Sequence, residues 1–360
     1  MGHLPIVNQL TVANVMGCGY ISTRGKLDKM WEKTTADIFS DILATRKDDF
    51  VFPWITAGEG KKNIGFKYIF KISGPPIFVQ GDKYPVKVPL DTQGWEYENP
   101  LSEAKALELW DKEILWNAIG KKSLRRGRSL THQTPMEDEK LIDLLNSINP
   151  SGPAKIKLQK KIYSHSLPIT INTTRLNWDS TILENVKKYT AGNRLSHLDL
   201  NRVAWRNDNL FRIEKSLEAW IMENIDKQRG KEFREQILDP KLDVSWFANY
   251  LPYGVAGSNM DVVVLQEGSS KKLATVIELK VSSLSAKGFL DASRQVLMYC
   301  EFIKRAFRAF GEDIETNGCI ISGPSRLRES SRSTANDLDV KWITYHIDNS
   351  NRVRFDHFLP

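Results

Sequence analysis

The chain has 360 residues, of which 51 are lysine or arginine and 44 are aspartate or glutamate, so its formal net charge is +7. The length favours two domains, and 41% hydrophobic residues are enough to build ordinary buried cores, which excludes a globally disordered chain. Apolar runs are only a few residues long, and the N-terminus lacks a basic segment followed by an apolar one. We therefore expect no membrane span and no signal peptide. The positive charge is compatible with a polyanionic partner but does not require one.

The cysteines and histidines argue against several chemistries. Three cysteines, Cys18, Cys300 and Cys319, are widely separated and odd in number, which predicts reduced thiols in a cytoplasmic protein. The six histidines show no metal-ligand spacing, and no Gly-x-x-x-x-Gly-Lys-Ser/Thr loop is present. The sequence therefore supports neither a zinc site nor a nucleotide-driven motor.

The first hundred residues combine helical and strand patterns. Residues 1–25 are predicted to form strand and turn, and apolar residues at helical spacing predict a helix over 26–46. Alternation over 66–72 predicts a half-buried strand, and two short strands are expected near 77–80 and 84–88. This part of the chain is therefore expected to be of mixed α and β structure.

A helix is predicted over 102–119, followed by a dense basic loop. The basic side chains of that loop are Lys121, Lys122, Arg125, Arg126 and Arg128. They could neutralise several phosphates of a nucleic acid, or they could simply be solvated charges. Thr134 is a good N-cap for the next helix, which the Asn-Pro-Ser-Gly-Pro segment 149–153 ends. We place the domain boundary there.

The second half of the chain begins with a linker, or the start of the second domain, over 154–205. Within it, apolar alternation occurs at 169–171 and a helix is expected over 180–189. The elements then expected are a helix over 209–225, strands at 261–265 and 274–281 joined by a polar turn, a helix over 286–310, and strands near 319–322, 341–346 and 352–355.

Three charged residues on the two central strands form the main candidate site. Glu278 and Lys280 are two residues apart on one strand, so their side chains project to the same face, and Asp261 begins the preceding strand. Two carboxylates can hold Mg²⁺, a hard ion that prefers oxygen ligands. A nearby lysine can orient or deprotonate a water, or stabilise phosphate charge. The triplet therefore fits phosphodiester hydrolysis, although Glu-x-Lys on a strand is also a common solvated pair.

The pattern Asp261…Glu278-Leu-Lys280 resembles the PD-(D/E)xK nuclease signature, with Met260 in place of the proline. Over residues 205–310 the chain is similar to the archaeal NucS-type branch. The matching features are Leu217-Glu218-Ala-Trp-Ile221, Gly257 before the aspartate, the Ile-Glu-Leu-Lys strand, and Gln295-Val-Leu-Met-Tyr299. The resemblance implies a restriction-endonuclease-like fold.

The same resemblance implies roles for five residues. Asp261 and Glu278 would be metal ligands, Lys280 the catalytic lysine and Glu218 a third acid near the metal, while Gln295 would contact the site or the DNA backbone. Simpler interpretations stay open. Glu218, or Glu214 one turn away, could be solvated, and Gln295 and Tyr299 could be ordinary polar positions on a packed helix.

Residues 50–150 resemble PUA-superfamily modules of the EVE and YTH type, small barrels that bind nucleic acid. The resemblance is carried by the early strands, the tryptophan-rich helix and the segment Ser-Leu-Arg125-Arg126-Gly-Arg128-Ser-Leu. Trp54 and Trp95 lie in segments flanked by glycine and proline, and could stack on an extruded base. Tryptophans in such positions are more often core residues.

The sequence thus predicts an α/β (α+β) protein of two domains. Residues 1–153 would form a small β-barrel-like recognition module, and residues 206–360 a nuclease domain with a mixed sheet flanked by helices. The predicted function is a Mg²⁺-dependent DNA endonuclease, with Mn²⁺ able to substitute, that cuts double-stranded DNA as a homodimer in restriction or modification-dependent restriction. The alternatives are a mismatch- or branch-specific repair nuclease and a non-catalytic nucleic-acid-binding protein.

Overall fold

The structure is a computed structural model. It describes residues 2–23, 33–56, 64–78, 84, 86–102, 104–106, 108, 131–133, 135–158, 193–194, 209–211, 213–253, 258–309, 311–324, 338–350 and 352–357. These residues form several open sheets and helices, which confirms the mixed α and β class.

The chain divides into two compact units, and the division is not a single cut. One unit is Met1–Lys26 with Asp41–Ser196, and the other is Leu27–Ser40 with His197–Pro360. The predicted boundary at residue 153 therefore differs from this division, in which residues 27–40 belong to the second unit and residues 154–196 to the first. A stretch rich in glycine and proline indicates a linker in the sequence, but it does not show which unit a helix packs against. That depends on contacts with residues far away in the chain. The Ser40 hydroxyl donates to Glu218, 178 residues further along the chain.

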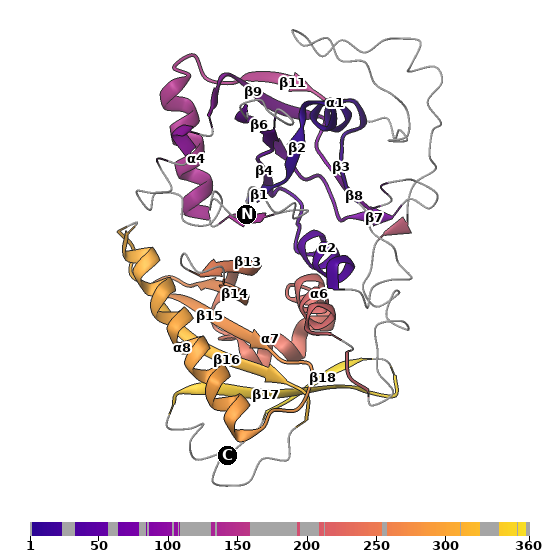
Figure 1. The fold of residues 1–360 in the computed structure, drawn as a ribbon, viewed down its shortest axis with the longest axis vertical. Helices are drawn as coiled ribbons and strands as arrows, with labels where there is room; N and C mark the ends of the chain where they lie inside the picture. The colour runs from indigo at the N-terminus through magenta and orange to yellow at the C-terminus, as the bar shows by residue number, and fades with distance from the viewer. Residues whose placement is uncertain are drawn as a thin grey trace. The chain divides into compact units, whose positions relative to one another are not determined.

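The first unit is built on short strands and helices (Figure 1). Its elements are β1 (Gly2–Leu4), β2 (Ile6–Asn8), α1 (Gln9–Cys18), β3 (Tyr20–Thr23), β4 (Phe50–Val51), β5 (Trp54–Thr56), β6 (Gly65–Lys71), β7 (Ile77–Phe78), β8 (Val86–Pro89), β9 (Gln93–Leu101), β10 (Thr131–Gln133), α4 (Pro135–Ile148), β11 (Ala154–Lys157) and β12 (Asn193–Arg194). One sheet has the order β10-β1-β4-β6-β5-β2, with β9 also paired to β6 and β11 paired to β9. The other has the order β12-β7-β8-β3. Within the described ranges neither sheet closes into the small barrel that we expected.

Helix α1 corrects the prediction of strand and turn over residues 1–25. β-Branched valines favour a strand, but Val12, Val15 and Met16 recur at helical spacing and are buried together with Cys18. Burial of that face outweighs local propensity. The strand over 66–72 is confirmed as β6, and the helix after Thr134 as α4. Most of the helix predicted over 102–119, and the elements predicted at 169–171 and 180–189, lie outside the described residues.

Two of the scattered histidines meet inside the first unit. His3 on β1 lies opposite His132 on β10. The two Nδ1 atoms are 2.8 Å apart, and His3 Nε2 lies 2.8 Å from Asp49 Oδ2. Burial lowers the pKa of His3, although Asp49 opposes that shift, so a neutral imidazole is favoured. The pairing holds the first strand in the sheet and depends on contacts that the sequence spacing of histidines does not reveal.

The second unit holds one mixed sheet between helices. Its elements are α2 (Lys33–Leu43, assigned here up to Ser40), α6 (Glu214–Asn224), η3 (Gln228–Gly230), α7 (Lys231–Ile237), β13 (Asp243–Tyr253), β14 (Ser258–Glu267), β15 (Lys272–Leu279), α8 (Ala286–Ala309), β16 (Glu315–Ser322), β17 (Val340–Ile347) and β18 (Val353–His357). The sheet order is β13-β14-β15-β16-β17-β18. Strands β15, β16 and β17 are parallel, and the other pairs are antiparallel.

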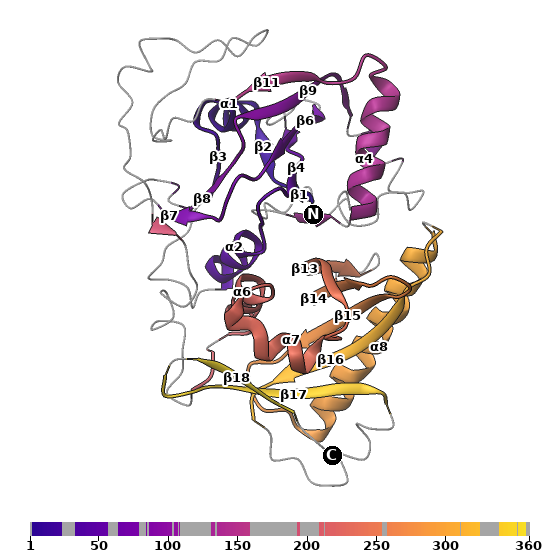
Figure 2. The ribbon, with the colours of Figure 1, turned by 180° about the vertical axis from the view of Figure 1, so that it is seen from behind.

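Helices cover both faces of this sheet. Figures 1 and 2 show α8 across one face, with α6 and α7 on the other. The predicted hairpin of β14 and β15 and the helix α8 are confirmed. Strand β13 and helix α7 were not predicted. A β-bulge between Val244 and Trp246 interrupts the alternation of β13, which removes the signal that a strand gives in sequence.

Gly318 on β16 is a sensitive contact between the sheet and α8. A Cβ atom at this glycine would lie 2.5 Å from Val296 Cγ1 of α8. We expect Gly318→Val to destabilise the protein by about 1–3 kcal/mol in urea unfolding, because the core is already filled there. Gly288→Ala is the matched control, since a Cβ there has only ordinary contacts from 3.4 Å outward. Equal stability of the two variants would contradict this packing.

Candidate active site

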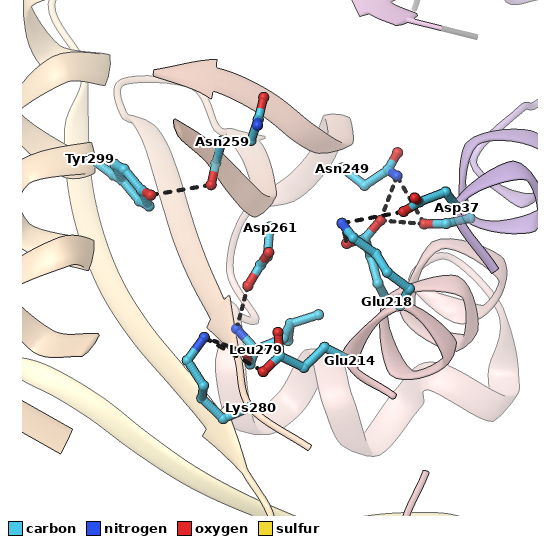
Figure 3. Close-up of polar contacts among 11 residues, drawn as sticks. Asp37, Glu214, Glu218, Asn249, Asn259, Asp261, Leu279, Lys280 and Tyr299 are labelled. Atoms are coloured by element: carbon cyan, nitrogen blue, oxygen red, sulfur yellow. Dashed lines mark hydrogen bonds and ion pairs between the residues drawn. The ribbon is translucent and has the colours of Figure 1, made fainter. Parts of the chain in front are cut away.

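The register of β14 and β15 brings the two predicted acids together. Val262 pairs with Ile277, and one further step of this antiparallel register sets Asp261 opposite Glu278. Directly opposed residues share a face of the sheet. The backbone N–H of Leu279 donates to Asp261 Oδ2 at 2.9 Å, which fixes that carboxylate across the strand ends (Figure 3).

Glu278 and Lys280 form a close ion pair at the end of β15. Lys280 Nζ donates to Glu278 Oε1 at 2.7 Å and to the Leu279 carbonyl oxygen at 2.8 Å. It also lies 3.8 Å from Oε1 of Glu214 on α6. The Glu278 side chain is only 4% exposed, whereas that of Lys280 is 29% exposed. Lys280 can therefore reach solvent while its ammonium stays against the buried acid.

One oxygen of the acid pair has no donor. Glu278 Oε2 is buried and has no hydrogen-bond partner within the part of the chain that the structure describes. Leaving a buried carboxylate oxygen unpaired costs free energy. The atom lies on the face that Asp261 shares, so an incoming cation could satisfy both carboxylates at once.

The protonation states of these groups reflect the same crowding. Burial, followed by the nearby charge of Glu278, raises the pKa of Asp261 to about 8. Burial also raises the pKa of Glu278, although Lys280 opposes the shift. The two carboxylates therefore cannot both ionise easily unless positive charge is added.

These residues fit a divalent metal of the Mg²⁺ type. The donors are carboxylate oxygens, which hard cations prefer, and two such ligands are typical where water and substrate phosphate complete the coordination. Throughout the described ranges, no group of three or more histidine, cysteine, aspartate or glutamate side chains is placed to hold a metal. Asp261 and Glu278 are the two carboxylates that could hold such a metal here.

The third predicted acid, Glu218, lies in a separate buried network. Its Oε1 accepts hydrogen bonds from Ser40 Oγ at 2.5 Å and from Asn249 Nδ2 at 2.6 Å. Its Oε2 accepts from Lys215 Nζ. Figure 3 shows Glu218 together with Asn249 and Asp37. The structure thus brings Asp261, Glu278 and Lys280 together and gives Glu218 other partners.

Gln295 lies on α8 one turn before Tyr299. Gln295 Nε2 donates to the Tyr299 hydroxyl at 2.6 Å, and that hydroxyl donates to the carbonyl oxygen of Asn259 at 3.2 Å. Burial, followed by the charges of Glu278 and Asp261 among other causes, raises the pKa of Tyr299, while Gln295 opposes the shift. These bonds tie α8 to the start of β14, just before Asp261. Through Tyr299, Gln295 therefore helps to hold the start of β14 against α8. Its predicted contact with the site or with DNA stays a prediction.

Lys215 is a residue of this region that the sequence analysis missed. Its ammonium contacts Glu218, lies 3.9 Å from Asp37 Oδ1, and stands 4.6 Å from the centroid of the Tyr250 ring. The nearby charges of Glu218 and Asp261 raise its pKa against the effect of burial. Its position three residues before Glu218 in a helix was an available signal, because such residues are neighbours on one face.

The tryptophans predicted to bind nucleic acid lie in or against the core of the first unit. Trp54 is fully buried on β5 and packs edge-to-face on Phe66, with ring centroids 4.9 Å apart. It has no open face for a base, so that prediction was wrong. Trp95 lies on β9 and packs, partly buried, on the same cluster. The basic residues Lys121, Lys122, Arg125, Arg126 and Arg128 lie outside the described residues.

Comparisons with known proteins add little. No protein-family model matches the chain, and no curated protein matches it. Among solved structures, the chain is similar to an XisH family protein from Nostoc punctiforme PCC 73102, at 14% identity and a TM-score of 0.23. That match covers 35% of this chain and 93% of the other. A likeness this distant supports no conclusion about function. Within the described ranges, every helix is too short or too polar to cross a membrane.

The raised pKa of Asp261, about 8, gives a pH prediction for the metal-free protein. The folded state binds a proton that the unfolded state has released, so stability falls as pH rises from about 4 to 8. Between pH 6 and pH 8 we expect a loss of roughly 2 kcal/mol in the free energy of urea unfolding. Asp261→Asn should remove that loss. An equal pH dependence in both proteins would contradict the assignment.

Proposed function

We propose that the chain is a Mg²⁺-dependent DNA endonuclease whose second unit hydrolyses the phosphodiester bond. The observation that carries the proposal is the pair Asp261 and Glu278 beside the Lys280 ammonium, with one buried Glu278 oxygen that has no hydrogen-bond partner among the described residues. Two crowded carboxylates and an adjacent lysine at the ends of neighbouring strands are what metal-assisted phosphate hydrolysis requires.

Each residue has a defined task in that reaction. Bound Mg²⁺ would supply the Lewis acidity that activates water and neutralises phosphate charge. Asp261 and Glu278 would hold it, and the Leu279 N–H keeps Asp261 oriented toward Glu278. Lys280, on a partly exposed side chain, can leave Glu278 and present its ammonium to the attacking water or to a phosphate oxygen.

The fold of the second unit supports this proposal. A mixed sheet with α8 on one face and α6 on the other fits the restriction-endonuclease-like arrangement that the sequence motif implies. The acids lie at the end of the central antiparallel hairpin, next to the first parallel pairing of β15 with β16.

The proposal extends to the rest of the chain. The first unit would read the DNA, and the substrate would be double-stranded DNA cut by a homodimer. A reader joined to a cutter in one chain favours restriction or modification-dependent restriction over repair. The fully buried Trp54 means that base recognition, if it uses this unit, relies on other side chains.

Plasmid cleavage tests the proposal. Purified protein should convert supercoiled plasmid to nicked or linear forms with Mg²⁺ or Mn²⁺, and not in EDTA. Glu278→Gln should lose this activity by at least about 10³-fold, whereas Glu235→Gln, on an exposed side chain of α7, should cut like the wild type. Absence of cleavage on every plasmid and oligonucleotide substrate tested, or full activity of Glu278→Gln, would overturn the proposal.

The kind of substrate separates restriction from repair. The same protein should be offered methylated, unmethylated and mismatched duplexes of one sequence, in equal amounts. Preference for one methylation state would support restriction, and preference for the mismatch would support repair. Equal cutting of all three would contradict both specific roles. Binding of DNA without any cleavage would favour a reader whose nuclease fold is structural.

A further inference from the structure

The surroundings of Glu218 define its role more narrowly than the sequence does. All of its described hydrogen bonds come from Ser40 on α2, Asn249 on β13 and Lys215 on α6, and together they use both carboxylate oxygens. The side chain is 1% exposed. A carboxylate held this way is already paired and desolvated, and moving it to a metal would strand the Lys215 ammonium in a buried place.

The network is built around the position of Asp261. Asn249 on β13 pairs with Val262, the residue that follows Asp261 on β14, so the Glu218 carboxylate is tied to the strand beside Asp261. The same register sets Tyr250 opposite Asp261, and the Lys215 ammonium lies 4.6 Å from the Tyr250 ring centroid. Glu218 thus holds the Lys215 ammonium near Asp261 and Glu278, although Glu218 is not one of these two acids.

We infer that Glu218 stands outside the metal site and acts as a positioning residue that keeps the nearby Lys215 ammonium in an ion pair of its own, so that it does not pair with Asp261. The inference rests on the function proposed above, because it concerns the surroundings of that metal site. The Glu218–Lys215 pair is neutral as a whole. It leaves Asp261 and Glu278, with two formal negative charges, for one divalent ion.

A positioning role and a ligand role for Glu218 predict different metal affinities in variants of this residue. Removing the charge of Glu218 alone frees Lys215 to pair with Asp261, and that cation then competes with the metal. Removing Lys215 as well eliminates the competitor. Metal affinity should therefore fall in Glu218→Gln and return in Glu218→Gln/Lys215→Met. If Glu218 were a ligand, both variants would lose affinity, and the second substitution would not restore it.

Binding of Mn²⁺ to the full chain, measured by electron paramagnetic resonance of the free ion, tests this directly. We expect one site per chain, a dissociation constant weakened about tenfold or more in Glu218→Gln, and recovery to within roughly threefold of wild type in the double variant. Glu278→Gln, which removes a ligand, should not be restored by Lys215→Met. Thermal unfolding of each protein controls for folding.

The Mn²⁺-binding results distinguish failure of the positioning role of Glu218 from failure of the proposed nuclease function. A double variant that folds but binds Mn²⁺ as poorly as Glu278→Gln would overturn the inference and make Glu218 a ligand, while leaving the nuclease proposal intact. A wild-type chain that binds no Mn²⁺ would overturn both. If Glu218→Gln alone does not fold, comparison of the double variant with wild type still decides the question.

Discussion

Lys280→Met is expected to slow DNA cleavage by about 10²–10⁴-fold while leaving Mn²⁺ bound. The ammonium of Lys280 is 2.7 Å from Glu278 Oε1 and is partly exposed, so it is the cation of this site that a substrate phosphate can reach. Removing it takes away the group that would orient water or balance charge in the transition state. It also removes a positive charge beside the metal ligands, so metal affinity should hold or rise.

The prediction is specific because the cleavage rate should fall while the metal affinity does not. Single-turnover cleavage of a plasmid measures the cleavage rate, and titration with Mn²⁺ measures the metal affinity. Lys231→Met, on an α7 side chain that is 58% exposed, is the matched control and should behave like wild type. A cleavage rate for Lys280→Met within about threefold of wild type would remove Lys280 from the mechanism.

Lys215→Met is expected to lower the free energy of unfolding by about 3–5 kcal/mol in the metal-free protein. The substitution leaves the Glu218 carboxylate, 1% exposed, without its ammonium partner. Ser40 and Asn249 still donate to it, but neutral donors do not replace a buried counter-charge. Urea unfolding followed by fluorescence measures the loss.

The double variant Glu218→Gln/Lys215→Met should recover most of that stability, because no buried charge is left unpaired. Lys231→Met again serves as control, with an expected change within about 0.5 kcal/mol. If Lys215→Met costs less than about 1 kcal/mol, the buried ion pair is not the stabilising contact that its geometry indicates.

Local patterns predicted the centre of the site well. Glu278 and Lys280 share a face because of strand alternation, and the polar turn after β14 fixed the hairpin that sets Asp261 opposite Glu278. These relations depend on residues close in sequence. The partner of Glu218 could not be predicted in this way, because Ser40 lies 178 residues away and joins the unit through α2.

The errors have equally physical causes. Glycine and proline near Trp54 indicated a loop, but pairing of β5 with β2 and β6 buries that ring. The bulge in β13 hid the strand that carries Asn249. The histidine spacing gave no hint that His3 and His132 meet across β1 and β10. For Trp54 and for the two histidines, long-range strand pairing, which no local pattern contains, decided the environment.

The most direct test of the central claim is the position of a bound Mn²⁺ ion, located by anomalous scattering from crystals of the full chain. We predict one ion between the carboxylates of Asp261 and Glu278, with Glu218 still hydrogen-bonded to Ser40 and Asn249. An ion bound elsewhere, or no ion between these two carboxylates at Mn²⁺ concentrations that saturate cleavage, would contradict the proposed centre.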